Sequence, residues 1–191
     1  MRQQEGRNTK PSACVIDAQS VKTSTSVPAT SHGTDNTKKI VGRKRSIATG
    51  KLGLLPAVLA TAAGVQDSVA GPQLLGQVAA AHPDLRKVWV DGGCRKHFAE
   101  HAATPGIDMK ITARTPGTRG FIPIPKRWAV ERTYGWLMLH RRLVRSCEAH
   151  PHRCEAMIRL AMSDLVDRRL TGEATLSWRD PTPMDQKHIP G

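Results

Sequence analysis

Apolar residues in the first half of the chain gather in short runs that are separated by polar stretches. Two of these runs end in an aspartate: 13–17 reads Ala-Cys-Val-Ile-Asp, and 87–91 reads Lys-Val-Trp-Val-Asp. Short runs rich in β-branched residues are typical of buried strands in a sheet that helices cover. We therefore predict one strand over 13–18 and another that ends at Asp91.

Three further segments have strand-like patterns. Residues 40–48 predict a strand, 49–53 a hairpin turn and 54–63 the returning strand. Pro56 favours an edge position or a bulge for that returning strand, because proline cannot donate a ladder hydrogen bond. Residues 109–112 predict a last short strand. The passage from the hairpin through a helix to the strand ending at Asp91 implies parallel strands.

Helical spacing of apolar residues appears in later segments. One helix is expected to open with Pro72 in its first turn, and another runs from Pro151 to about 171–172. A short helix is expected over 95–103, and the Ser- and Thr-rich stretch 19–36 reads as a long loop. The residues expected to face inward are Leu74, Leu75, Val78 and Ala81 in the first helix and Met157, Leu160, Ala161 and Leu165 in the last.

A helix predicted over 126–143 carries most of the candidate chemistry. Glu131 is its only acidic residue, among several basic ones, and it follows Arg127 by four positions, so the two share a helical face. A surface ion pair is one interpretation of this pair. A metal ligand beside cations that hold a polyanion is the other.

Two aspartates at strand ends supply the remaining oxygen ligands for such a metal. Asp17 and Asp91 are each expected at the rim of the sheet, which is where ligands bind in open α/β sheets. Each alone could simply be a turn residue. Together with Glu131 they form an all-oxygen set that suits Mg²⁺ or Mn²⁺.

Four motifs in order support this interpretation. The segments 16–22 (IDAQSVK), 41–45 (VGRKR), 88–93 (VWVDGG) and 127–133 (RWAVERT) together resemble the catalytic domain of bacterial insertion-sequence transposases with a DDE triad. The resemblance is to the insertion-sequence-five type, within the insertion-sequence-four-like superfamily. It covers about residues 13 to 170.

The resemblance implies an α/β fold: an RNase H-like mixed sheet flanked by helices, in a compact form without a large insertion between Asp91 and Glu131. It implies metal-dependent DNA cleavage and strand transfer in transposition of an insertion sequence. Asp17, Asp91 and Glu131 would be the catalytic residues and the ligands of two Mg²⁺ or Mn²⁺ ions. The partners would be double-stranded DNA, at the element ends and the target, and a second copy of the chain in a homodimer on DNA.

Charge points to the same partner. Lys and Arg number 29 against 16 Asp and Glu, a net charge of +13, which favours a polyanion such as nucleic acid. Aromatic residues make up only 4%, which argues against an extended stacking platform for single strands. The cations expected to contact phosphate, which carries no base identity, are Lys39, Arg43, Lys44, Arg45, Arg127, Arg141 and Arg142.

The remaining signals concern compartment and metal type. The sequence contains no apolar run of membrane-spanning length and no secretory signal at its start. Nothing pairs its four cysteines, so a cytoplasmic, nucleoid-associated protein without a membrane partner is expected. The cluster of Cys147, His150, His152 and Cys154 lacks common zinc spacing, and a helix that starts at Pro151 explains it better.

The domain interpretation has three parts: a flexible N-terminus over 1–12, the catalytic domain over 13–170 and a disordered C-terminal tail over 171–191. Since no base-reading module is evident, we expect an upstream N-terminal transposase polypeptide to recognise the element ends. Two alternatives stay open. One is an RNase H-fold nuclease that cuts without joining, and the other is an inactive remnant that only binds DNA.

Overall fold

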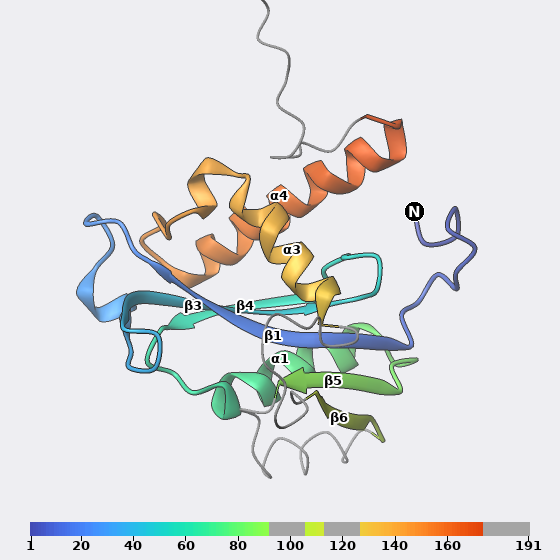
Figure 1. Ribbon diagram of the computed structural model, residues 1–191, viewed down its shortest axis with the longest axis horizontal. Coiled ribbons are helices and arrows are strands. Elements are labelled where there is room, and N and C mark those ends of the chain that lie inside the picture. The colour runs from blue at the N-terminus through green and yellow to red at the C-terminus, as the bar shows by residue number, and fades with distance from the viewer. Residues whose placement is uncertain (92–105, 113–126, 174–191) are drawn as a thin grey trace, which may run out of the picture.

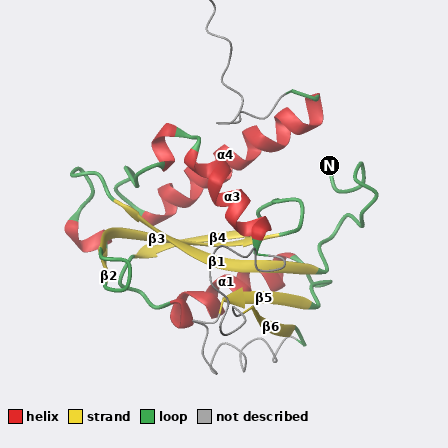
Figure 2. Ribbon diagram, viewed as in Figure 1, coloured by secondary structure: helices red, strands yellow, loops and turns green. Residues whose placement is uncertain are grey.

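A computed structural model describes residues 1–91, 106–112 and 127–173. Six strands form one sheet, and helices cover both of its faces (Figures 1 and 2). The strands are β1 (Ala13–Lys22), β2 (Gly33–Asp35), β3 (Ile40–Thr49), β4 (Ala57–Ala62), β5 (Lys87–Asp91) and β6 (Asp108–Thr112). The helices are η1 (Ala29–Ser31), α1 (Asp67–Ala81), α3 (Trp128–Met138), η2 (Arg141–Leu143) and α4 (Pro151–Thr171).

The sheet is mixed, as predicted. Its strands follow the order β2-β3-β1-β5-β6, and β4 pairs with β3. The strands β1, β3 and β4 form an antiparallel meander, whereas β5 pairs with β1 and with β6 in parallel. The two predicted hairpin strands and the predicted strand ending at Asp91 are confirmed. Among the described strands, β4 pairs with β3 alone, which agrees with the edge position that Pro56 favoured.

Side chains alternate between the two faces of the sheet and build two apolar cores. On one face, Cys14, Ile16, Val88 and Val90 pack with Leu74, Leu75 and Val78 of α1. On the other face, Val15, Ile47 and Val58 pack with Val130 and Leu137 of α3 and with Ile158 and Leu165 of α4. The period of two therefore decides which helix each strand residue meets.

The first strand is longer than the sequence predicted. β1 continues to Lys22, and within the stretch expected to be one long loop lie the end of β1, η1 and β2. The reason is tertiary: β3 lies antiparallel to β1 from Val15↔Thr49 to Lys22↔Gly42 and supplies ladder partners for these polar residues. A hydrogen bond of 2.5 Å from the Ser20 hydroxyl to Asp35 then joins β1 to β2.

The helix boundaries differ from the expectation in two places. α1 begins at Asp67, so Pro72 lies inside it; Ala70 and Gly71 pack against the sheet and extend the helix one turn before the proline. Ala81 is exposed, unlike the three other residues expected to face inward. The helix predicted over 126–143 ends at Met138 and is followed by η2.

The last helix agrees closely with its prediction. α4 starts with Pro151 in its first turn and stops at Gly172, whose φ of +77° gives the left-handed C-terminal cap that glycine adopts without strain. Ala161 and Leu165 are buried as expected, but Leu160 is 62% exposed. The expected helix over 95–103 and the tail over 174–191 lie outside the described residues. Over the part of the chain that is described, none of the helices has the length and apolar character that crossing a membrane requires.

Candidate active site

The strand register brings the two aspartates together. β1 and β5 run parallel, and their last paired residues are Val15 and Trp89. Asp17 and Asp91 each follow by two positions, so they lie side by side where the two strands separate. Because Val15 and Trp89 face α3 and α4, the period of two turns both aspartates toward the same face. Asp17 lies within β1, which continues along β3, and not at a strand end as predicted.

The third carboxylate comes from α3, in its first turn. Glu131 and both aspartates surround the guanidinium of Arg127, one helical turn before Glu131. Arg127 Nη1 lies 3.0 Å from Asp91 Oδ1, Nη2 lies 3.3 Å from Asp17 Oδ2, and Nε lies 3.7 Å from Glu131 Oε1. The structure thus gathers the three carboxylates that the sequence singled out around one cation.

Tyr134 fixes the position of α3 over the two strands. Its buried hydroxyl lies 2.8 Å from the carbonyl oxygen of Asp17 and 2.7 Å from that of Arg45, so its proton is shared between β1 and β3. Burial first, and then the nearby Asp17 carboxylate, raise the pKa of Tyr134 and keep it protonated as a donor. No role was predicted for Tyr134. The signal available was its position one turn after Glu131, as the only tyrosine of the chain.

The three carboxylates differ in their exposure to water. The Asp17 side chain is 17% exposed, whereas those of Asp91 and Glu131 are 49% and 47% exposed. Burial raises the pKa of Asp17, and the neighbouring charge of Asp91 acts in the same direction. The Ala18 backbone N–H, 2.8 Å from Asp17 Oδ1, and the charge of Arg127 oppose this rise. The charge of the neighbouring Arg127 guanidinium therefore favours the ionised form of Asp17 against the effect of burial.

The donor set suits a hard divalent cation, but a guanidinium holds the shared position. Carboxylate oxygens from two strands and one helix are the ligands that Mg²⁺ takes. In this arrangement no three His, Cys, Asp or Glu side chains within the described residues are close enough to enclose one ion. The three carboxylates are spread around the Arg127 guanidinium, so a metal ion at this position would have to displace it. The donor chemistry fits such an ion.

The basic run on β3 is not a phosphate-binding surface, and this part of the prediction needs correction. Arg43 and Arg45 are 0% exposed. Arg43 donates to the carbonyl oxygens of Ser31, Glu148 and Ala149 and to the hydroxyls of Ser31 and Ser146. Arg45 donates to the carbonyl oxygens of Leu143 and Arg145. Both guanidinium groups tie β3 to the segment between α3 and α4.

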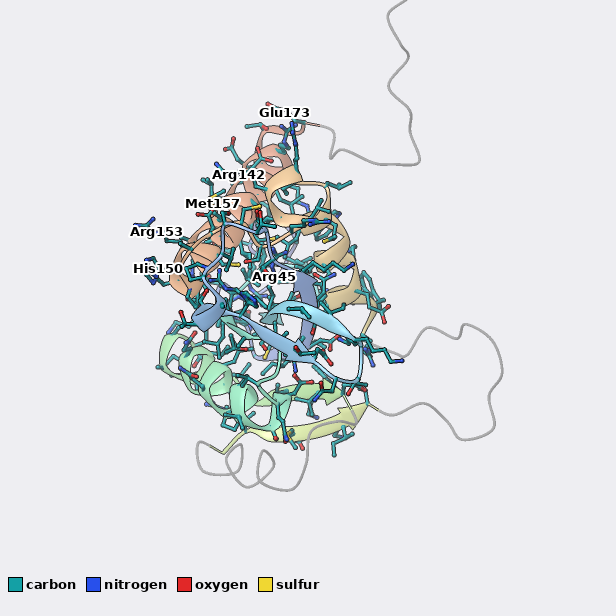
Figure 3. All side chains as sticks on the ribbon, turned by 90° about the vertical axis from the view of Figure 1, so that its left-hand side faces the viewer. Arg45, Arg142, His150, Arg153, Met157 and Glu173 are labelled. Carbon is teal, nitrogen blue, oxygen red and sulfur yellow. The ribbon has the colours of Figure 1, made fainter. Side chains whose placement is uncertain are left out.

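Of the remaining predicted phosphate contacts, Lys44 is buried, whereas three others are exposed. Lys44 is buried, donates to the Val65 carbonyl oxygen and lies 3.0 Å from Asp67, so it too is occupied. Lys39, Arg141 and Arg142 are exposed. Figure 3 shows Arg45 between the sheet and the helices, whereas Arg142 and Arg153 lie on the outside near α4.

The prediction that a helix starts at Pro151 is confirmed. Cys154 is buried in the second core, and the rings of His150 and His152 stack at 5.3 Å between centroids. These residues form the start of α4, and the proline lies in its first turn. The start of α4 and its packing against the second core thus account for these cysteines and histidines without a zinc site.

A stack of tryptophans and arginines along α3 was not foreseen. The Arg132 guanidinium carbon lies 4.3 Å from the ring centroid of Trp128 and 4.6 Å from that of Trp136. Arg169 of α4 lies 4.2 Å from the Trp136 ring. Trp128, Arg132 and Trp136 follow one another by four positions and therefore share a helical face, but only the fold shows that the three groups stack.

Comparison with known proteins identifies the family. The model of the transposase DDE domain matches residues 8–165. The chain belongs to this family. The matched region contains the three candidate carboxylates, Asp17, Asp91 and Glu131. The match confirms that the four motifs belong to a transposase DDE domain. No curated protein matches the sequence.

Two solved structures are similar to this DDE domain. One is the simian T-cell lymphotropic virus intasome in complex with PP2A regulatory subunit B56 gamma, at 15% identity and a TM-score of 0.51. The match covers 82% of the DDE domain chain and 49% of that chain, so the DDE domain spans about half its length. The other is the catalytic core domain of BIV integrase, with 16% identity, a TM-score of 0.48 and coverage of 81% and 82%. The RNase H-like fold, a mixed sheet with flanking helices in a compact form, agrees with the prediction.

Proposed function

We propose that this DDE domain performs metal-dependent DNA cleavage and strand transfer in the transposition of an insertion sequence of the insertion-sequence-five type. The observation that carries the proposal is the convergence of Asp17, Asp91 and Glu131, from two strands and a helix, on a single cation. Membership in the transposase DDE-domain family supports the class of reaction. The net charge of +13 supports DNA as the partner.

The carboxylates would hold two Mg²⁺ or Mn²⁺ ions. Asp17 would be a ligand of both ions, and Asp91 and Glu131 would each complete one of them. When bound, the ions supply activation of the attacking oxygen and neutralisation of charge on the phosphate. The hydrogen bond from the Tyr134 hydroxyl to the Asp17 carbonyl oxygen holds α3 against β1 beside Asp17. Once metal ions displace Arg127 from the carboxylates, its guanidinium is free to hold a phosphate at the rim of the site.

Contacts to the DNA backbone would come from the exposed cations. Arg141 and Arg142 lie in η2, and the Arg142 side chain is 70% exposed, 3.9 Å from Glu148. Lys39 is exposed in the turn between β2 and β3. These positions replace the buried β3 run as candidates, and a homodimer on DNA would present two such surfaces.

The experiment that tests the proposal separates cutting from joining. The protein is incubated with labelled DNA carrying the element ends and a circular target plasmid, with Mg²⁺, with Mn²⁺ or with a chelator. We expect metal-dependent nicks at the ends and then products covalently joined to the plasmid. Nicks without joined products would support the nuclease alternative. DNA binding that needs no metal, with neither product, would support the inactive remnant.

Arg127→Ala is expected to increase the affinity for Mg²⁺ about tenfold or more. Removing a unit cation at about 3 to 4 Å from a metal position relieves a repulsion worth a few kcal/mol at an effective dielectric of about 20, and each 1.4 kcal/mol changes a dissociation constant about tenfold. Isothermal titration calorimetry with Mg²⁺ measures the change directly, and the metal-induced rise in Tm follows it.

Arg132→Ala is the matched control for this prediction. Arg132 lies on the same helix but stacks between Trp128 and Trp136, away from the carboxylates. It should leave the affinity for Mg²⁺ unchanged. An Arg127→Ala protein that binds Mg²⁺ no more tightly than the wild type would show that the guanidinium does not compete for the metal position.

A further inference from the structure

The outward face of α4 exposes apolar side chains. Leu160 is 62% exposed and Leu170 is 46% exposed, whereas Ile158, Ala161 and Leu165 of the same helix are buried against the sheet. Figure 1 shows α4 as an outer layer of the molecule, on the other side of the sheet from α1. Apolar residues gathered on one exposed face are typical of a surface that another protein covers.

Two hollows border this face of α4. One, of about 530 Å³, lies between α4 and the connection from β3 to β4, where Leu54 and Leu55 form part of its wall. The other, of about 800 Å³, lies between α4 and η2. Ser163 and Asp167 line both hollows, so they belong to a ridge that separates them. A ridge beside a groove is the shape against which a second helix packs.

The ridge is a row of three exposed residues at spacing four: Arg159, Ser163 and Asp167. Its centre is small, because serine lies between the two charged residues. The Ser163 hydroxyl donates a hydrogen bond of 3.1 Å to the carbonyl oxygen of Arg159 in the same helix. Ser163 therefore allows another backbone to approach closely and brings no unpaired hydroxyl into a contact.

The two charges of the ridge are available to a partner. Within the described residues, neither Arg159 nor Asp167 has an ion-pair partner, whereas the neighbouring Asp164 lies 3.2 Å from Arg168. Arg159 and Asp167 are eight positions apart, which is about 12 Å along the helix axis, so they cannot pair with each other. One cation and one anion thus stand at equal distances on either side of Ser163.

We propose that this ridge binds the same ridge of a second copy of the chain, antiparallel to it and about a two-fold axis at Ser163. The axis places Arg159 of each copy opposite Asp167 of the other, because both residues lie four positions from Ser163. Two identical ion pairs form in this way. Leu160 lies only three positions from the axis, so the two exposed leucines approach each other and remove apolar surface from water.

The inference rests on the proposed function only in taking the partner to be a second copy, and it names the surface that the proposed homodimer left open. Its contacts require neither DNA nor metal. The ridge contains none of the three candidate carboxylates and none of the cations proposed to contact DNA. A dimer formed through α4 therefore keeps both copies of the candidate site available.

The expected affinity is modest. A single pair of helices buries less surface than the about 800 Å² per partner of a standard interface. We therefore expect a dissociation constant on the order of 1 to 100 µM. Sedimentation velocity of the full chain without DNA or divalent metal, over about 1 to 300 µM, covers this range and should show a shift from monomer to dimer.

Charge reversal tests which surface forms the dimer. Arg159→Asp gives the ridge two aspartates, and Asp167→Arg gives it two arginines, so each variant alone should dimerise about tenfold or more weakly than the wild type. An equal mixture of the two variants should recover the dimer, because each copy then meets opposite charges at both positions. This recovery excludes misfolding as the cause of the loss. Arg142→Asp changes the net charge as Arg159→Asp does but lies outside the ridge, and it should dimerise like the wild type.

A disulfide tests the position of the axis. In a chain with Cys94→Ser and Cys147→Ser, Ser163→Cys should form a covalent dimer under mild oxidation, because a residue on the axis meets its own counterpart. Ala156→Cys is the matched control. It is exposed on the same helix, but its two copies would lie about 20 Å apart along the antiparallel helices, too far for a disulfide.

Three results would overturn the inference: a wild-type protein that stays monomeric, charge-reversed variants that dimerise like the wild type, or a mixture of the two variants that does not recover the dimer. These outcomes are independent of catalysis. A protein that dimerises through α4 but neither cleaves nor joins DNA would contradict the proposed activity alone. A protein that cleaves and joins DNA but shows no such dimer would contradict only the contact through α4.

Discussion

Asp91→Asn is expected to abolish metal-dependent DNA cleavage while leaving DNA binding intact. The substitution keeps the shape of the side chain and removes one of the charges that face Arg127 at 3.0 Å. A divalent ion that loses one of three carboxylate ligands binds weakly and in the wrong geometry. Loss of about 3 to 4 kcal/mol of transition-state stabilisation corresponds to a fall in rate of about 10² to 10³-fold or more.

The measurement is the rate of nicking of a labelled duplex in Mg²⁺, together with DNA affinity by fluorescence anisotropy. Asp84→Asn is the matched control, because Asp84 is 55% exposed and pairs only loosely with Lys10, at 3.6 Å. It should cleave like the wild type. If Asp91→Asn also retained cleavage, Asp91 would not be a ligand and the proposed site would be wrong.

Arg43→Met is expected to lower the free energy of unfolding by about 3 to 5 kcal/mol, the range for removing one partner from a buried charged network. Five hydrogen bonds from its guanidinium reach η1 and the segment before α4, and methionine would leave the partly buried carbonyl oxygens of Ser31, Glu148 and Ala149 without this donor. Urea unfolding measures the loss, and a fall in Tm on the order of 10 °C should accompany it.

Arg142→Met is the control for this change and tests the opposite role. Its side chain is 70% exposed, so stability should change by less than about 0.5 kcal/mol. If Arg142 contacts a phosphate, the slope of log K against log salt should fall in magnitude by about 0.9. A stable Arg43→Met protein with a reduced salt slope would restore the phosphate-binding role that the sequence suggested for the β3 run.

The sequence by itself predicted every described strand except β2, and it determined the order of the acidic residues. Short β-branched runs, the hairpin turn, the proline at the start of α4 and the glycine at its end act through backbone preferences that extend over only a few residues. The period of two along β1 and β5 turns Asp17 and Asp91 to one face, and the spacing of four along α3 places Arg127 beside Glu131. These local rules, together with the four ordered motifs, were enough to predict the fold and the candidate triad.

Only the tertiary structure decided the roles of the basic residues and the limits of several elements. Arg43 and Arg45 read as a charged surface because local sequence does not show which carbonyl oxygens will surround them. Apart from Ser31, their partners lie about a hundred positions away along the chain. The ends of β1 and α3 depend in the same way on distant partners: β3 extends the strand, and η2 turns the Leu143 carbonyl toward Arg45. Burial and hydrogen bonding are properties of the assembled fold, so a charge that looks exposed in the sequence can instead hold the core together.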